Sequence, residues 1–212
     1  MALIILSAVS GTGKSTIAQG LTRRAPAWRI SVSHTTRRPR TGETEGVSYH
    51  FVGTEEFERM IDAGVFAEWA QYVDNYYGTS RDKVEEAIAV GNDLIFDIEL
   101  EGARQLKHAY PEAQSIFILP PSFEELERRL YGRGTDTAEK IIRRLRRGLV
   151  ELSHIDEFDH VIVNESIEKS MDLITGIRDG KTVNMGNNGT LVEKLLQGMK
   201  ASLDSSETES VS

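Results

Sequence analysis

The chain has 212 residues, 39% of them hydrophobic and 27% charged, which is the composition of a globular protein large enough for a substantial core. It contains no cysteine, which excludes disulfides and thiolate metal sites, and no apolar run approaches the ~20 residues needed to cross a bilayer. The formal net charge of -8 argues against nucleic acid or an anionic membrane as a partner, so bound anions require local clusters of Arg and Lys. These properties together favour a cytoplasmic location.

The core of the chain is predicted to be an α/β fold. Short β-branched runs alternate with amphipathic stretches, a pattern typical of a largely parallel sheet flanked by helices. The most apolar runs predict five strands, at residues 2–7, 29–33, 93–98, 114–119 and 160–164. A helix is predicted over residues 14–24, directly after the first strand and a Gly-rich turn.

Residues 34–80 differ in character from the rest of the chain. They hold most of the aromatic residues and much of the glycine. One helix is predicted over residues 55–63, between strand-like pieces at 49–52 and 65–72. This composition indicates a small lobe inserted into the α/β core.

Two helices in the second half of the chain have recognisable starts. Ser122 and Glu125 form a capping-box pattern for a helix that runs to about Tyr131. Asp136 and Glu139 repeat the pattern for an Arg-rich helix that continues past residue 145. The segment 179–212 reads as a partly disordered extension, with loop-like residues, a short helix over 190–203 and a disordered end from residue 204.

The clearest motif is Ser10-Gly11-Thr12-Gly13-Lys14-Ser15-Thr16, which follows a predicted strand and opens a predicted helix. Its glycines allow backbone N–H groups to converge on phosphate oxygens, and the helix N-terminus favours negative charge. Lys14 is expected to reach the β- and γ-phosphates of ATP, and Ser15 to bind Mg²⁺. The full motif has Gly where this chain has Ala8, which we expect to cause mild strain. The alternative is a chance Gly-rich turn, and the motif alone does not separate a kinase from a GTPase.

Further motifs resemble the guanylate kinase family, in one order from about Leu3 to Ile177. They lie at residues 31–43, 46–52, 68–70, 75–80, 97–99, 120–122, 133–136 and 161–164. The resemblance implies a P-loop kinase core with a parallel five-stranded sheet, an inserted GMP-binding lobe and a helical lid. Within a domain at 1–178, the core would comprise 1–33, 81–120 and 153–178, the lobe 34–80 and the lid 121–152.

The predicted lobe contains residue types that can recognise guanine by hydrogen bonding. Guanine presents two N–H donors beside the O6 acceptor, so a carboxylate can accept from both donors and a hydroxyl can donate to O6. Adenine has an acceptor at N1, so the same carboxylate would lose its partner and the base would be rejected. The resemblance assigns Glu68 as this carboxylate and Ser33 and Thr79 as the hydroxyls. Taken alone, a Glu such as Glu68 is more often a surface carboxylate.

The phosphate of GMP needs positively charged partners, and Arg binds phosphate through paired, charge-assisted hydrogen bonds. The resemblance assigns Arg37, Arg40, Tyr49 and Tyr77 to this phosphate. Arg37, Arg38 and Arg40 could otherwise form a solvated basic turn, and the tyrosines could simply pack in the lobe. For Arg38 we expect only the role of a solvated basic residue in this turn.

Seven arginines lie on or just after the two capped helices, and a salt-bridged, solvated face explains most of them. The resemblance implies that Arg129, Arg133 and Arg144 close over the phosphates and, with Lys14 and Arg37, form the catalytic set. No general base is required, because the attacking group is a GMP phosphate whose second pKa of about 6 leaves it mostly dianionic. Catalysis would then consist of positioning, lid closure and charge neutralisation.

Three polar residues follow core strands. Asp97 and Glu99 come at the end of one strand, where P-loop proteins place acids near Mg²⁺ and the family places acids near GMP; both alternatives stay open. Asn164 ends the last strand, and the resemblance places it near the adenine of ATP.

The resemblance therefore implies an ATP:GMP phosphotransferase that also accepts dGMP, uses Mg²⁺ and binds neither nucleic acid nor a membrane. A kinase with another phosphorylated acceptor is an alternative, against which the set Ser33, Glu68 and Thr79 speaks. A non-catalytic protein-binding module is a second, against which the intact Lys14 and Ser15 speak. We expect removal of residues 204–212 to leave activity unchanged.

Overall fold

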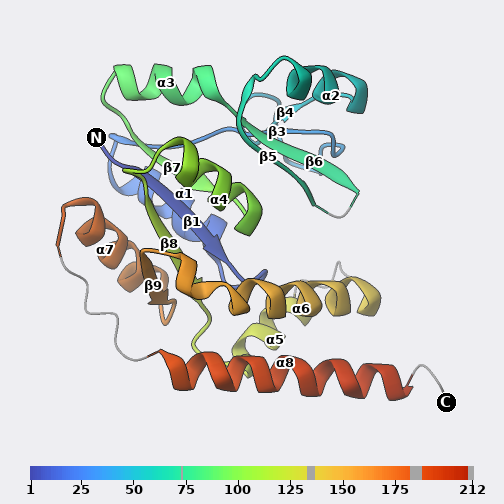
Figure 1. The fold of residues 1–212 in the computed structure, drawn as a ribbon. Helices are drawn as coiled ribbons and strands as arrows, with labels where there is room; N and C mark the ends of the chain where they lie inside the picture. The colour runs from blue at the N-terminus through green and yellow to red at the C-terminus, as the bar shows by residue number, and fades with distance from the viewer. Residues whose placement is uncertain (73, 133–136, 182–187, 210–212) are drawn as a thin grey trace. The chain divides into compact units, whose positions relative to one another are not determined.

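The computed structural model describes residues 1–72, 74–132, 137–181 and 188–209, and Figure 1 shows its helices and strands. The chain divides into two compact units, unit 1 with residues 1–6 and 21–115, and unit 2 with residues 7–20 and 116–212. Strands β1 (Leu3–Ala8) and β8 (Gln114–Leu119) and helix α1 (Lys14–Arg24) each contribute residues to both units.

The remaining elements of unit 1 are β2 (Trp28–Ile30), β3 (His34–Thr35), β4 (His50–Phe51), α2 (Thr54–Asp62), β5 (Phe66–Tyr72), β6 (Asn75–Ser80), α3 (Arg81–Ala89), β7 (Asp93–Asp97) and α4 (Leu100–Ala109). Unit 2 adds α5 (Phe123–Tyr131), α6 (Ala138–Ser153), a short 3-10 turn at Ile155–Glu157, β9 (His160–Val163), α7 (Ile167–Arg178) and α8 (Gly189–Glu209). Within the described residues, no helix is long and apolar enough to span a membrane.

The larger sheet has five strands in the order β2-β7-β1-β8-β9. The pairs β2–β7, β1–β7 and β8–β9 are parallel, and the central strands β7, β1 and β8 are buried on both faces, as parallel strands covered by helices must be. The predicted α/β fold with a five-stranded parallel sheet is confirmed. The second strand lies slightly earlier than predicted: β2 begins at Trp28, which is buried, and ends at Ile30, so Ser33 lies beyond it.

A second, four-stranded sheet lies within the predicted lobe, in the order β4-β3-β6-β5. Strands β5 and β6 form its antiparallel hairpin, and the sequence analysis defines neither β3 nor β6. The pairing of β5 with β6 shifts register between Phe66, which faces Ser80, and Glu68, which faces Thr79. A bulge of this kind redirects the side chains that follow it.

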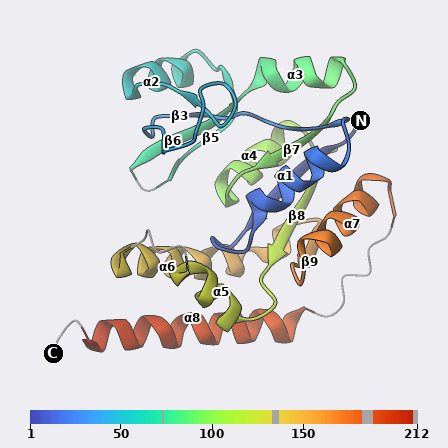
Figure 2. The same ribbon diagram turned by 180° about the vertical axis from the view of Figure 1, so that it is seen from behind.

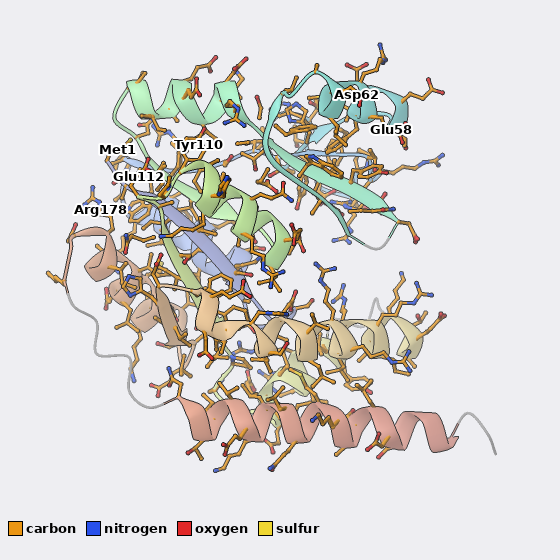
Figure 3. All side chains as sticks on the ribbon, in the orientation of Figure 1. Met1, Glu58, Asp62, Tyr110, Glu112 and Arg178 are labelled. Atoms are coloured by element: carbon orange, nitrogen blue, oxygen red, sulfur yellow. The ribbon has the colours of Figure 1, made fainter. Side chains whose placement is uncertain are left out.

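Aromatic packing holds helix α2 against this sheet. The Phe57 ring, which is completely buried, stacks on Phe66 and Tyr76 with ring centroids 4.5 and 5.3 Å apart. A Cβ at Gly78 would lie 2.9 Å from the Phe66 ring, so only glycine fits beneath this stack. The opposite face of α2 carries exposed acidic residues, including Glu58 and Asp62 (Figure 3).

The two capped helices of unit 2 begin almost where the sequence predicts. Ser122 Oγ accepts from the Glu125 N–H at 3.2 Å and caps α5, as expected. Helix α6 is capped by Thr137, whose Oγ1 accepts from the Lys140 N–H, so the predicted start at Asp136 is one residue too early. Asp136 itself lies outside the described residues.

Helix α8 is longer than the sequence predicts and belongs to the core of unit 2. Leu195 and Met199 on α8 are completely buried and Leu203 is 8% exposed, in one cluster with residues of α5 and α6. Both ribbon views show α8 running beside these two helices (Figures 1 and 2). The structure extends α8 to Glu209, beyond the end of the short helix predicted over residues 190–203.

Truncations of the C-terminus are expected to distinguish the part of α8 that carries the buried Leu195, Met199 and Leu203 from the part that begins at residue 204. Deleting residues 204–212 keeps all three buried side chains, so we expect the melting temperature to change by less than about 3 °C. Deleting residues 189–212 removes them from the core and should lower the melting temperature by roughly 10 °C or more. Thermal unfolding of both truncated proteins measures this, and equal melting temperatures would contradict the packing role of α8.

Candidate functional site

In unit 1 the bulge in β5 brings three polar side chains together. Glu68 lies across from Thr79, and the Thr79 hydroxyl donates to Glu68 Oε1 at 2.5 Å. The Ser33 hydroxyl lies 3.4 Å from Thr79 Oγ1. Glu68 is only 4% exposed and Thr79 is completely buried. The structure thus assembles, within one unit, the carboxylate and two hydroxyls that the sequence assigns to the base.

Burial changes the acid–base behaviour of Glu68. Desolvation raises the pKa of its carboxyl group to about 7, with a further increase from the nearby Glu99, while the hydrogen bond from Thr79 acts in the opposite direction. A carboxyl group in an apolar environment favours its neutral form in this way. Glu68 is therefore poised to change its charge near neutral pH.

The raised pKa of Glu68 predicts a pH-dependent cost to stability. The folded protein keeps the Glu68 proton up to about pH 7, whereas the unfolded chain loses it near pH 4.5. The preference of the folded state for protonated Glu68 therefore contributes stability that is complete below pH 4.5 and is lost as pH rises through 7. Glu68→Gln, which stays neutral, should therefore raise the melting temperature at pH 8 by on the order of 5 °C and leave it nearly unchanged at pH 4.5. Melting curves at both pH values check this; the same shift at both would mean that charge is not the cause.

The N-terminus of helix α4 lies against the Glu68 carboxylate. Glu99 caps this helix, with its Oε1 accepting from the Gly102 N–H at 3.2 Å. A Cβ built at Gly102 would lie 2.5 Å from Glu68 Oε2. Gln105, one turn further along α4, accepts from the Trp69 N–H at 3.1 Å and donates to the Trp69 carbonyl at 2.9 Å. No function for Gly102 or Gln105 is predicted from the sequence, because only the fold brings α4 beside β5.

A second cluster of unit 1 contains Arg37, Tyr49 and Tyr77. The Arg37 guanidinium lies over the Tyr49 ring, 5.3 Å from its centroid, and the two tyrosine rings meet edge to face at 5.9 Å. Burial is the main cause that raises the pKa of Tyr49, and the charge of Asp97 also raises it. The structure therefore places Asp97 within electrostatic range of this cluster, together with three of the four residues assigned to the acceptor phosphate.

Glu43, for which no function is predicted from the sequence, bonds to the Arg37 side chain of this cluster and to the backbone of Arg40. Its Oε1 accepts from Arg37 Nη2 at 2.7 Å, and its Oε2 accepts from the Arg40 backbone N–H at 2.7 Å. The hydrogen bond from Arg37 holds the pKa of the Glu43 carboxyl below its ordinary value. Arg40 is exposed, so its guanidinium is not held within the cluster as that of Arg37 is.

In unit 2 the loop from Ser10 to Thr16 joins β1 to α1. Gly11 and Gly13 have φ angles of 99° and 102°, a left-handed backbone conformation that residues other than glycine rarely adopt. The Thr12 N–H and hydroxyl both donate to the Val9 carbonyl, at 3.1 and 2.7 Å. Ala8 is the last residue of strand β1, so its extended backbone does not require the glycine of the full motif. Lys14, Ser15 and Thr16 form the first turn of α1.

Two predicted site residues converge on this loop. Arg129 Nη1 and Asn164 Nδ2 both donate to the Thr12 carbonyl, at 2.8 and 2.7 Å. Asn164 is buried, and its Oδ1 accepts from the Ser170 hydroxyl at 2.9 Å. The Nδ2 end of the Asn164 amide thus bonds the loop, and the Oδ1 end bonds helix α7.

Arg144 and Arg133 are the other two arginines predicted to belong to the lid. Arg144 is half-buried on α6, and Arg133 lies outside the described residues. Arg143 and Arg147 pair with Glu139 and Glu151 along the same helix, as a salt-bridged face would. In the part of the chain that the structure describes, no group of His, Cys, Asp or Glu could hold a metal ion without a ligand's help.

Comparisons with known proteins find that the chain is similar to guanylate kinases. The sequence model of the family "Guanylate kinase" matches residues 1–177. A guanylate kinase from Chromohalobacter salexigens is 50% identical over 170 residues, which are 80% of this chain and 79% of the relative. One from Haemophilus influenzae is 46% identical and covers 92% of this chain and 97% of its own length. The crystal structure of guanylate kinase from Anaplasma phagocytophilum aligns with a TM-score of 0.70 and 35% identity, over 87% of this chain and 88% of that chain.

Proposed function

The chain belongs to the guanylate kinase family, and we propose on this premise that it transfers the γ-phosphoryl group of ATP to GMP, and to dGMP, forming ADP and GDP or dGDP. The observation that carries the proposal is the set formed in unit 1 by the buried Glu68 and Thr79 with the half-buried Ser33. A buried carboxylate with an adjacent hydroxyl complements the two N–H donors and the O6 acceptor of guanine. It would leave its own polar groups unpaired against adenine.

The ionised form of Glu68 is the one that accepts both guanine donors. Because its pKa is raised to about 7 by burial, binding of GMP would favour loss of the Glu68 proton. Two hydrogen bonds from the base would then replace the missing solvation of the carboxylate. The cost of burying Glu68 is thus offset only when guanine is bound, which increases selectivity for this base.

For the acceptor phosphate we propose the Arg37, Tyr49 and Tyr77 cluster, joined by Arg40. Glu43 accepts from Arg37 Nη2 and the Arg38 carbonyl accepts from Arg37 Nη1, so the guanidinium is held at both Nη atoms. Arg37 is held in place before the substrate arrives, which reduces the entropy lost on binding. Asp97 and Glu99 are proposed to lie near the substrate, and the capping bond of Glu99 to Gly102 ties it to the base side.

For ATP we propose that backbone N–H groups of residues 10–16, with the side chains of Lys14 and Thr16, bind the phosphates. Ser15, in the first turn of α1 and exposed, offers a hydroxyl oxygen of the kind that Mg²⁺ prefers. The metal ion would neutralise charge on the transferring phosphoryl group. Arg129, Arg133 and Arg144 are proposed to add positive charge there. The substrates and the lack of cysteine also favour a cytoplasmic location.

The experiment that tests the function is an acceptor series. Purified protein is mixed with Mg-ATP and GMP, dGMP, AMP, CMP, UMP or a phosphorylated sugar, and release of ADP is followed. We expect rapid ADP formation with GMP and dGMP, and rates at least ~100-fold lower with AMP. Turnover with another acceptor alone would indicate a kinase of different specificity. A folded protein that binds ATP but turns over no acceptor would indicate a non-catalytic binding module.

A further inference from the structure

The missing side chain of Gly102 leaves room for the carboxylate that we propose to read the base. Gly102 is the third residue of helix α4 and belongs to the same unit as Glu68. A Cβ there would lie 2.5 Å from Glu68 Oε2 and 3.3 Å from Glu68 Cδ. Carbon and oxygen atoms in ordinary contact are more than 3 Å apart, so Ala at position 102 and Glu68 in its present position exclude one another.

Glu68 has little freedom to move away. Its Oε1 accepts the Thr79 hydroxyl at 2.5 Å, and the side chain is 4% exposed. The bulge in β5 fixes the backbone from which it extends. A displacement of the carboxylate therefore lengthens its bond with Thr79 and changes its position relative to Ser33.

Helix α4 is equally constrained. Gln105 is bonded to both the N–H and the carbonyl of Trp69, the residue after Glu68, which fixes the position of α4 along β5. Leu100, Ala103 and Leu106 bury the inner face of α4. Backing the helix away would break both bonds and expose this face, so an added methyl group at 102 is expected to displace the carboxylate rather than the helix.

Glycine at position 102 also makes helix α4 less stable than alanine would. Gly is among the weakest helix formers and Ala the strongest, so Ala at position 102 would favour α4 itself. The capping bond from the Gly102 N–H to Glu99 is made by the backbone and does not need glycine. The close approach to Glu68 is the observation that accounts for glycine here.

We propose that Gly102 is a positioning residue for base recognition: by leaving space for Glu68 Oε2, it sets where the carboxylate meets the N–H donors of guanine. This inference rests on the proposed function. Gly102 touches no substrate atom in this account, and its effect passes entirely through Glu68. It determines specificity for the purine base and should leave the use of ATP unaffected.

The test measures initial rates of wild type, Gly102→Ala, Glu68→Asp and the double variant, varying GMP at saturating ATP and the reverse. Gly102→Ala should raise KM for GMP ~10- to 100-fold and change KM for ATP by less than about 2-fold. Glu68→Asp shortens the side chain by one methylene and withdraws it from position 102. In that background Gly102→Ala should change KM for GMP by less than about 3-fold.

Gly53→Ala is the matched control, because Gly53 lies in the same unit, has a φ of -73° and has no atom within 4 Å of an added Cβ. It should change neither KM by more than about 2-fold. If Gly102→Ala leaves KM for GMP unchanged, or raises it equally in the Glu68→Asp background, the inference is wrong. If Gly102→Ala does not fold, a double variant that folds supports the contact and one that does not overturns it. Wild-type protein inactive with GMP would instead reject the proposed function.

Discussion

Replacing Lys14 with alanine is expected to lower kcat about 1,000-fold or more while the protein stays folded. Lys14 begins helix α1 directly after Gly11 and Gly13, the two left-handed glycines of the proposed phosphate loop. In the proposed reaction its ammonium group neutralises charge on the transferring phosphoryl group. Removing one such preorganised donor from a phosphoryl- or acyl-transfer site costs several kcal/mol of transition-state stabilisation. Steady-state rates with Mg-ATP and GMP measure the loss.

A matched control is Lys83→Ala, which removes the same side chain from an exposed pair with Glu86. It should leave kcat within about 2-fold, since exposed ion pairs contribute little. Melting temperatures of both variants show whether either loss arises from unfolding. Lys14→Ala protein with near-normal turnover would reject the assignment of residues 10–16 as the ATP phosphate loop.

The second large effect concerns the base. Glu68→Gln is expected to lower kcat/KM for GMP about 100- to 10,000-fold and to change KM for ATP by less than about 3-fold. A carboxamide presents one oxygen acceptor and an N–H₂ donor where guanine offers two donors, so a donor faces a donor in the buried site. Rates with GMP and ATP varied separately measure the two effects. Equal losses for both substrates would mean that Glu68 does not read the base.

Exposed Glu86→Gln makes the same chemical change outside the site and serves as the control, with both kinetic constants expected within about 2-fold of wild type. The melting temperature of Glu68→Gln provides a further control, because it shows whether lost activity arises from unfolding. The variant should melt at a higher temperature than wild type at pH 8, because it no longer buries a charge. A protein that is more stable and yet nearly inactive with GMP cannot owe its loss to unfolding, and shows that the site sacrifices stability for recognition.

Two structural elements were predictable from local patterns. The bounds of α1 are those that the sequence predicts, because a Gly-rich turn and a helical apolar pattern are local signals. The cap of α5 by Ser122 is also local, since the hydroxyl and its partner N–H are three residues apart. Helix α6 and the end of α8 were predicted less well. The Asp136 signal competes with an equally good cap at Thr137, and α8 is stabilised by residues more than 40 positions away.

The predicted phosphate loop, the five core strands and the kinds of side chain that a guanine site needs could all be inferred from the sequence. These follow from residue types and their order, which local geometry and base chemistry make interpretable. How these parts are held depends on contacts between distant segments: the bulge that sets Glu68 against Thr79, the bonds of Arg129 and Asn164 to the Thr12 carbonyl, and the gap at Gly102. Each of these joins residues 11 to 152 positions apart, and close packing between distant segments leaves no signal in the sequence of either one.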